Sequence, residues 1–164
     1  MAPATLSGSG GVTTRRSSLG ADVLLSFSPD LHNASRYTKV TDVPIYDVHK
    51  RARRKADGSV VEDYVGPEQL DRVAKNTQSR IDEAEYPLVL IGHTDDDGPE
   101  ADQPPLAGFV GGVRVGDYRG RKMIYADLYI RNDRAEAAAE FPRRSVEIVR
   151  KLEPDGFIDA LALL

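Results

Sequence analysis

The stretch "GPEQLDRVAKNTQSRIDEAEYPLVLIGH", residues 66–93, predicts a helix followed by a buried strand. Pro67 suits the first helical position, where its missing N–H costs nothing. Apolar side chains then recur at helical spacing, so one face of a helix over 66–85 should pack on a core; they are Leu70, Val73, Ala74 and Ile81. Pro87 ends the helix, and the short apolar run 88–93 is typical of a strand buried on both faces.

The segments around this stretch read mainly as strands. Asp57-Gly58 predicts a tight turn, and the two segments that flank it should form a hairpin. A short helix is expected over 134–141, ending at Pro142. The expected strands span residues 21–28, 42–50, 59–65, 106–116, 121–130, 144–151 and 157–164. This pattern favours a β-rich α+β domain, either a barrel or a curled sheet covered by helices.

The organisation of the chain indicates one domain. Residues 1–20 are rich in Ser, Gly and Thr without apolar periodicity, so we expect a disordered tail there. Residues 21–164 then form a single domain of ordinary size. Because the sequence stops inside an apolar strand, we expect the domain to be cut from a longer polypeptide.

The composition excludes several classes of partner and chemistry. A net charge of −4 offers no footprint for nucleic acid or for an anionic membrane. No apolar run reaches the length of a membrane span, and no signal-peptide pattern is present, so a soluble, intracellular protein is expected. The absence of cysteine leaves Ser, Thr or Lys for any covalent catalysis.

His93 stands in "LIGHTDDDG", residues 90–98, and three interpretations compete for it. It can be a structural residue, a metal ligand together with Asp95, Asp96 and Asp97, or a general base. The metal interpretation lacks a second histidine at ligand spacing, and consecutive aspartates do not match a calcium loop. The two other histidines, His32 and His49, lie in segments without an acid–nucleophile pattern and read as surface residues or as satisfied structural residues.

Ser145 is the candidate nucleophile, since it follows two arginines at the start of a predicted strand. Most isolated serines are structural. A possible pairing with His93 favours a catalytic role for Ser145, because an imidazole within about 2.6–3.2 Å of a serine hydroxyl can activate it. Spacing alone does not place the two strands side by side. Arg143 and Arg144 could lend charge or backbone N–H groups to an oxyanion.

Five motifs in order resemble one protein family. They are "GPEQLDRVAKNTQSRIDEAEYPLVLIGHTDDDG", "QPPLAGFVGGVRV", "RKMIYADLYI", "FPRRSVEIV" and "DGFIDALALL", which together span roughly residues 60–164. This series resembles the prohead (capsid maturation) serine proteases of tailed phages, most closely the Mu-like protease and scaffold proteins, which are related to herpesvirus assemblins.

The resemblance implies a herpesvirus-assemblin-like β-barrel surrounded by a few helices and a cofactor-free serine endopeptidase. Ser145 would be the nucleophile and His93 the general base. The third catalytic residue would be Glu147, which strand alternation places on the same face as Ser145, or Asp159 on the closing strand. Both acids can equally be ordinary surface charges.

The resemblance also implies a biological setting. The enzyme would act in the host cytoplasm inside the assembling prohead, with the scaffolding protein, the major capsid protein and itself as substrates, and it could form a homodimer or higher oligomer. Two alternatives remain: an inactive structural or scaffold-binding module of capsid assembly, and a metal-dependent hydrolase built on His93 and the aspartates.

Overall fold

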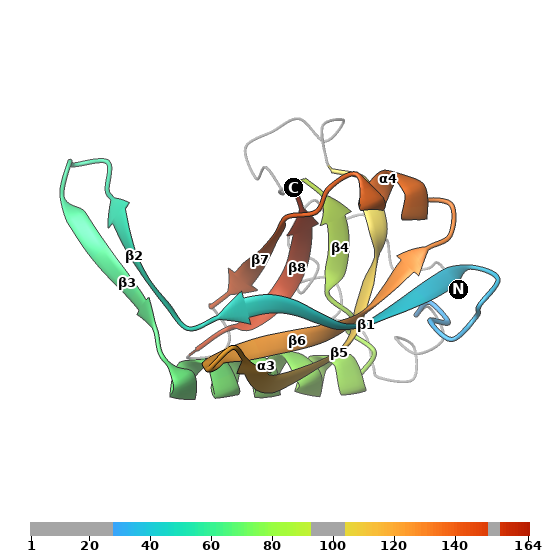
Figure 1. The fold of residues 1–164 in the computed structure, drawn as a ribbon, viewed down its shortest axis with the longest axis horizontal. Coiled ribbons are helices and arrows are strands. Elements are labelled where there is room, and N and C mark those ends of the chain that lie inside the picture. Colours follow the sequence, from blue (N-terminus) through green and yellow to red (C-terminus); the bar gives the residue numbers. More distant parts are fainter. Residues whose placement is uncertain (1–27, 93–103, 151–154) are drawn as a thin grey trace, which may run out of the picture.

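The computed structural model describes residues 28–92, 104–150 and 155–164. Most of these residues belong to strands, with two helices between them, so the domain is a β-rich α+β structure (Figure 1). The strands are β1 (Tyr37–Asp47), β2 (His49–Arg54), β3 (Val60–Val65), β4 (Leu88–Ile91), β5 (Leu106–Tyr118), β6 (Arg121–Arg131), β7 (Arg144–Val149) and β8 (Phe157–Leu163). The helices are α3 (Pro67–Asp82) and α4 (Ala135–Ala139).

Six strands form one sheet in the order β1-β6-β5-β4-β8-β7. Strands β4 and β8 are parallel, and every other neighbouring pair is antiparallel. The sheet curls until its two edge strands approach each other, and the Arg144 Nε donates to the carbonyl oxygen of Pro44 at 3.0 Å. The two edge strands, β1 and β7, do not pair, so the described strands form an open curled sheet. This is one of the two expected arrangements, and it differs from the closed barrel that the resemblance implies.

Helix α3 packs along one face of this sheet (Figure 1). The four apolar positions predicted for its inner face are all buried, as is Thr77 between them. A side chain of the helix also accepts a backbone hydrogen bond from the sheet at a point where the strand pairing is irregular. Gln78 Oε1 accepts the N–H of Val113 at 2.9 Å, next to a shift of register in β5.

Thr77 accepts a backbone hydrogen bond from β8 in the same way. Its side chain is fully buried; the hydroxyl donates to the carbonyl oxygen of Val73 at 2.7 Å and accepts the N–H of Ile158 at 2.9 Å. The register of β7 and β8 shifts beside this bond, where Glu147 lies opposite Ala160 and Ile148 opposite Ile158. Asp159 is therefore the extra residue of a β-bulge.

Strands β2 and β3 form a separate two-stranded sheet that projects away from the rest of the domain (Figure 1). The predicted turn is present, with Gly58 at φ +86°. The expected strand 42–50 was wrong in its bounds, because the chain changes sheet at Val48, and the basic segment His49–Arg54 pairs with β3 instead. The expected strand over 21–28 lies outside the described residues except for Ser28.

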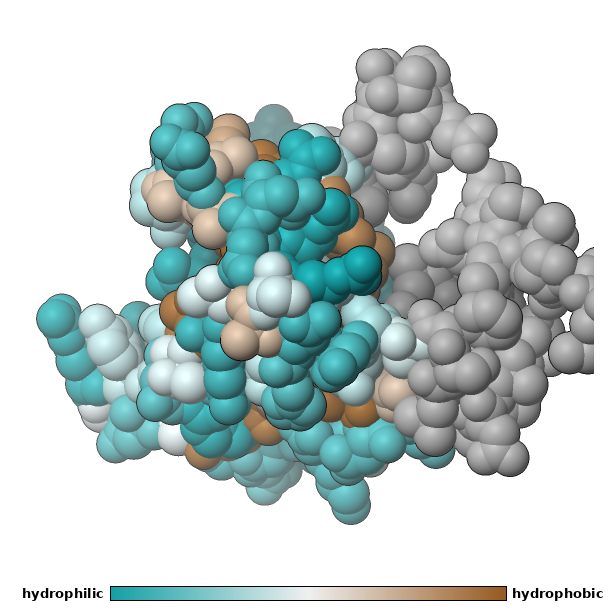
Figure 2. Space-filling view, turned by 90° about the vertical axis from the view of Figure 1, so that its right-hand side faces the viewer, coloured by the Kyte–Doolittle hydropathy of each residue, from teal (hydrophilic) through white to brown (hydrophobic). Residues whose placement is uncertain are grey.

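Hydrophilic residues cover most of the described surface in the side view, with small hydrophobic patches between them (Figure 2). In the described ranges, no helix has the length and apolar character needed to span a membrane.

Candidate active site at the paired ends of β4 and β7

Ser145 is the second residue of β7, an edge strand of the curled sheet, and its side chain is half-buried. The strand pairs with β8 so that Ser145 lies opposite Ala162. On the other side of β8, Leu90 of β4 lies opposite the same Ala162. Ser145, Ala162 and Leu90 thus form one row across three neighbouring strands.

The end of β4 reaches the same edge of the sheet. Gly92 donates its N–H to the carbonyl oxygen of Leu163 at 2.9 Å, and Leu163 lies opposite Arg144 on its other side. Leu163 of β8 is therefore flanked by Gly92, which precedes His93, and by Arg144, which precedes Ser145. His93 itself, with Asp95, Asp96 and Asp97, lies outside the described residues.

Gly92 also redirects the chain at this point. Its φ is +105°, a conformation that residues with a side chain rarely adopt. The chain therefore leaves β4 by a bend that glycine permits, directly before the histidine of the "LIGH" motif.

Glu147 lies on the Ser145 side of the sheet. It is half-buried and pairs with Ala160, two residues along the strand from the Ser145–Ala162 pair. Two residues of an extended strand span roughly 6.6 Å, and alternation points their side chains to the same face. The neighbouring side chains Val146 and Ile148 pack against the core cluster on the opposite face.

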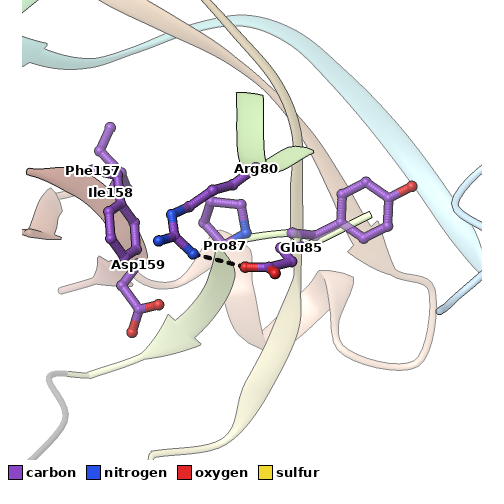
Figure 3. A pocket seen from close by; sticks show the side chains of 7 residues that line it. Arg80, Glu85, Pro87, Phe157, Ile158 and Asp159 are labelled. Atoms are coloured by element: carbon purple, nitrogen blue, oxygen red, sulfur yellow. Dashed lines mark hydrogen bonds and ion pairs between the residues drawn. The ribbon is translucent and has the colours of Figure 1, made fainter. Parts of the chain in front are cut away.

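Asp159 lies in a different environment. It lines a small pocket together with the C-terminal end of α3 and the residues that precede β4 (Figure 3). Within this pocket the Arg80 guanidinium stacks 3.6 Å from the centre of the Phe157 ring and donates to Glu85 at 2.8 Å. The pocket adjoins Pro87, at the start of β4, whereas Gly92 follows the end of that strand.

Arg143 and Arg144, which precede Ser145, are the candidate donors to an oxyanion. The N–H of Arg143 is taken by the carbonyl oxygen of Leu164 at 3.0 Å, so it cannot serve an oxyanion. The guanidinium of Arg144 donates to the carbonyl oxygens of Pro44 and Pro142 at 3.0 and 3.2 Å. Because paired residues alternate in an antiparallel ladder, the backbone N–H of Arg144 points to the outer edge of β7. The sequence named both arginines as possible donors but did not distinguish them, since the direction of an N–H depends on register.

The two other histidines have contacts of their own. His49 contacts the carbonyl oxygen of Asp47 through Nδ1 at 2.8 Å and packs against the Tyr46 ring. His32 lies edge-on to the Tyr129 ring. Among the described residues, no group of histidine and acidic side chains has an arrangement that could hold a metal ion.

Comparisons with protein-family models, with curated proteins and with solved structures give no match.

Proposed function

We propose that the protein is a serine endopeptidase with Ser145 as nucleophile and His93 as general base. The observation that supports this most strongly is the position of Leu163, which bonds Gly92 of the histidine segment and lies opposite Arg144 of the serine strand. Strands β4 and β7 are separated by one strand, so their backbones lie about 9.6 Å apart. An imidazole and a hydroxymethyl group extending toward each other can cross that separation.

Small side chains on β8 favour such a meeting. Ala160 and Ala162 occupy the positions opposite Glu147 and Ser145, on the face where the catalytic groups would meet. A larger side chain at either position would fill the space between β7 and the end of β4.

The reaction follows from these roles. His93 takes the Ser145 proton while the serine oxygen bonds to the carbonyl carbon of the scissile peptide. The backbone N–H of Arg144, at the open edge of β7, is the described donor best placed to stabilise the resulting oxyanion. The protonated imidazole then gives its proton to the leaving amine as the peptide C–N bond breaks. Water then attacks the carbonyl carbon of the acyl-enzyme while His93 takes a proton from it. The bond between this carbon and the Ser145 oxygen breaks as His93 returns the proton to the serine.

The third catalytic residue in this proposal is Glu147 rather than Asp159. Glu147 shares the strand and the face of Ser145, about 6.6 Å along the chain. Asp159 is three residues from Ala162 and lines the pocket at the opposite end of β4 from Gly92. Glu147 is therefore the acid on the face of Ser145, whereas Asp159 lines the pocket of Arg80 and Phe157.

The substrate and setting follow from the resemblance to prohead proteases. In this proposal the enzyme cleaves the scaffolding protein, extensions of the major capsid protein and itself inside an assembling phage prohead. The curled sheet with its nearly meeting edges supports an assemblin-like arrangement, although β1 and β7 do not pair.

Self-cleavage gives a test that needs no knowledge of the natural substrate. The full chain, incubated alone, should lose intact mass over time, and Ser145→Ala should abolish this loss. Ser79→Ala, at an exposed position on α3, is the matched control and should process normally. Processing that persists in Ser145→Ala contradicts the proposal, and processing that a chelator stops in the wild type indicates a metal-dependent hydrolase instead.

A further inference from the structure

Strands β2 and β3 and their connecting turn, residues 49–65, form an arm that the proposed catalytic chemistry does not use. The arm projects from the domain, and among the described strands its two strands pair only with each other (Figure 1). A two-stranded hairpin is marginally stable in water by itself, and its outer edges are templates for a further strand. The arm is thus suited to bind an additional extended segment.

The charge of the arm is opposite to that of the remaining chain. Residues 49–65 contain five basic residues, at positions 50, 51, 53, 54 and 55, and three acidic ones, at 57, 62 and 63. The arm therefore carries +2 and the remainder −6, which together give the net −4 of the chain. All five basic residues belong to β2 or directly follow it, whereas β3 contains two of the acids.

One face of the arm combines this positive charge with exposed apolar surface. Lys50 lies opposite Tyr64, and Arg54 lies opposite Val60, so the four side chains share a face. Tyr64 is 66% exposed and Val60 is 60% exposed, the two highest values among the large hydrophobic side chains described. Between them Glu62 pairs with Lys50 at 3.0 Å.

We propose that the arm is a docking site for an extended polypeptide segment in which acidic and apolar side chains alternate at every second residue, so that both kinds lie on one face of the segment. The segment adds as a third strand along the outer edge of β2. There its carboxylates lie beside Lys50 and Arg54, whereas along β3 they would meet Glu62. On the same face its apolar side chain lies beside Ala52, between the two carboxylates, and extends the exposed surface of Tyr64 and Val60. Backbone hydrogen bonds to the β2 edge supply affinity that does not depend on sequence.

The same observations disfavour nucleic acid as the occupant. A polyphosphate chain attracts a protein through a dense and uninterrupted positive field. Here acidic residues stand on the partner strand and the remainder of the chain is negative, so the field falls off quickly with distance from β2. A few carboxylates on a peptide need only short-range contacts.

Binding of defined probes to the full chain tests this proposal independently of Ser145. The probe is a fluorescein-labelled, end-capped peptide as long as β2 in which glutamate and leucine alternate at every second position, with threonine between them. Fluorescence anisotropy measures its affinity. Lys50→Glu with Arg54→Glu should weaken binding about tenfold, because two attractive pairs become repulsive. The matched control, Lys75→Glu with Arg134→Glu, makes the same charge change at exposed positions outside the arm and should bind normally.

Two further sets of measurements distinguish between the possible binding partners. A peptide with the same composition but with its glutamates grouped at one end, and a short DNA duplex, should both bind more weakly than the alternating peptide. Tyr64→Ser with Val60→Ser should weaken the alternating peptide even in high salt. If the charge-reversed arm loses its strand structure by circular dichroism, Lys50→Gln with Arg54→Gln replaces it and should weaken binding in the same direction.

Several results would overturn the proposal. They are tighter binding of the duplex than of the alternating peptide, equal binding of the grouped peptide, equal loss in the control variant, and no measurable binding of the alternating peptide to the wild type.

Discussion

Gly92 and Leu163 are joined by a backbone hydrogen bond of 2.9 Å, and this bond fixes the end of β4 beside β8. Leu163 is in turn the partner of Arg144 at the start of β7. The segment that leads to His93 and the strand that carries Ser145 therefore arrive at one edge of the sheet, although about fifty residues separate them in the sequence. This relationship is the structural basis of the proposed peptidase.

The bend at Gly92 should be sensitive to a side chain. Gly92→Ala places a Cβ on a residue with φ +105°, so we expect a loss of about 1–3 kcal/mol in the free energy of unfolding. Gly112→Ala is the matched control, since a Cβ there would meet its nearest neighbour at an ordinary 3.7 Å. Urea unfolding of both variants measures the difference. Equal stability of the two would show that the bend tolerates any residue.

Glu147 and Asp159 should differ in their effect on the reactivity of Ser145. Glu147→Gln should slow the reaction of Ser145 with a fluorophosphonate by roughly 10²–10⁴-fold, because an orienting carboxylate fixes the useful histidine tautomer. Asp159→Asn should leave the rate nearly unchanged, since this residue lines the pocket of Arg80 and Phe157. The opposite ranking of the two variants would transfer the role to Asp159.

Thr77 should stabilise the start of β8 through its hydroxyl rather than through its volume. Thr77→Val keeps the size but leaves the N–H of Ile158 without its acceptor, which should cost about 1–3 kcal/mol. Thr77→Ser keeps the acceptor. Amide hydrogen exchange at Ile158 provides the readout, with fast exchange expected in the valine variant and retained protection in the serine variant. Equal protection in both variants would mean that another group accepts this N–H.

Tyr86 should link stability to alkaline pH. Burial, with smaller effects of Tyr129 and Asp30, raises the pKa of the Tyr86 hydroxyl above its usual value near 10. The folded state therefore holds this proton more tightly than the unfolded state does. The resulting stability is fully present below the unfolded pKa and is lost as the pH rises through the folded pKa.

Tyr86→Phe should remove this dependence. The free energy of unfolding of the wild type should fall between neutral pH and about pH 11, and that of the phenylalanine variant should fall less. Tyr64→Phe, at a side chain that is 66% exposed, is the control and should follow the wild type. A phenylalanine variant that loses stability as steeply as the wild type would rule out Tyr86 as the source.

The sequence allowed the local elements to be predicted where periodicity and turn residues agreed. Helix α3 and its buried face, the short strand β4 and the turn at Gly58 are confirmed, because each depends on neighbours in the chain. Residues 51–54 of β2 were not expected to be a strand, since arginine has little β preference and this segment lacks apolar alternation. Its pairing with β3 decides its structure.

The candidate site was less accessible to sequence reasoning because it depends on strand order. The spacing of His93 and Ser145 does not show that a single strand separates β4 from β7. The bulge at Asp159 likewise arises from the pairing of β7 and β8 and from the side chain of Thr77, residues distant in sequence. The resemblance to prohead proteases suggested the candidate catalytic residues. Among the two acids, the structure favours Glu147, which shares the face of Ser145, over Asp159.

The most direct test of the central claim is the site of covalent modification by a fluorophosphonate, mapped by mass spectrometry in the wild type and in His93→Ala. The account predicts modification of Ser145 in the wild type, at a rate that declines as the pH falls below about 6.5, and none in His93→Ala. Modification of other serines in place of Ser145, or equal modification of Ser145 in His93→Ala, would contradict it.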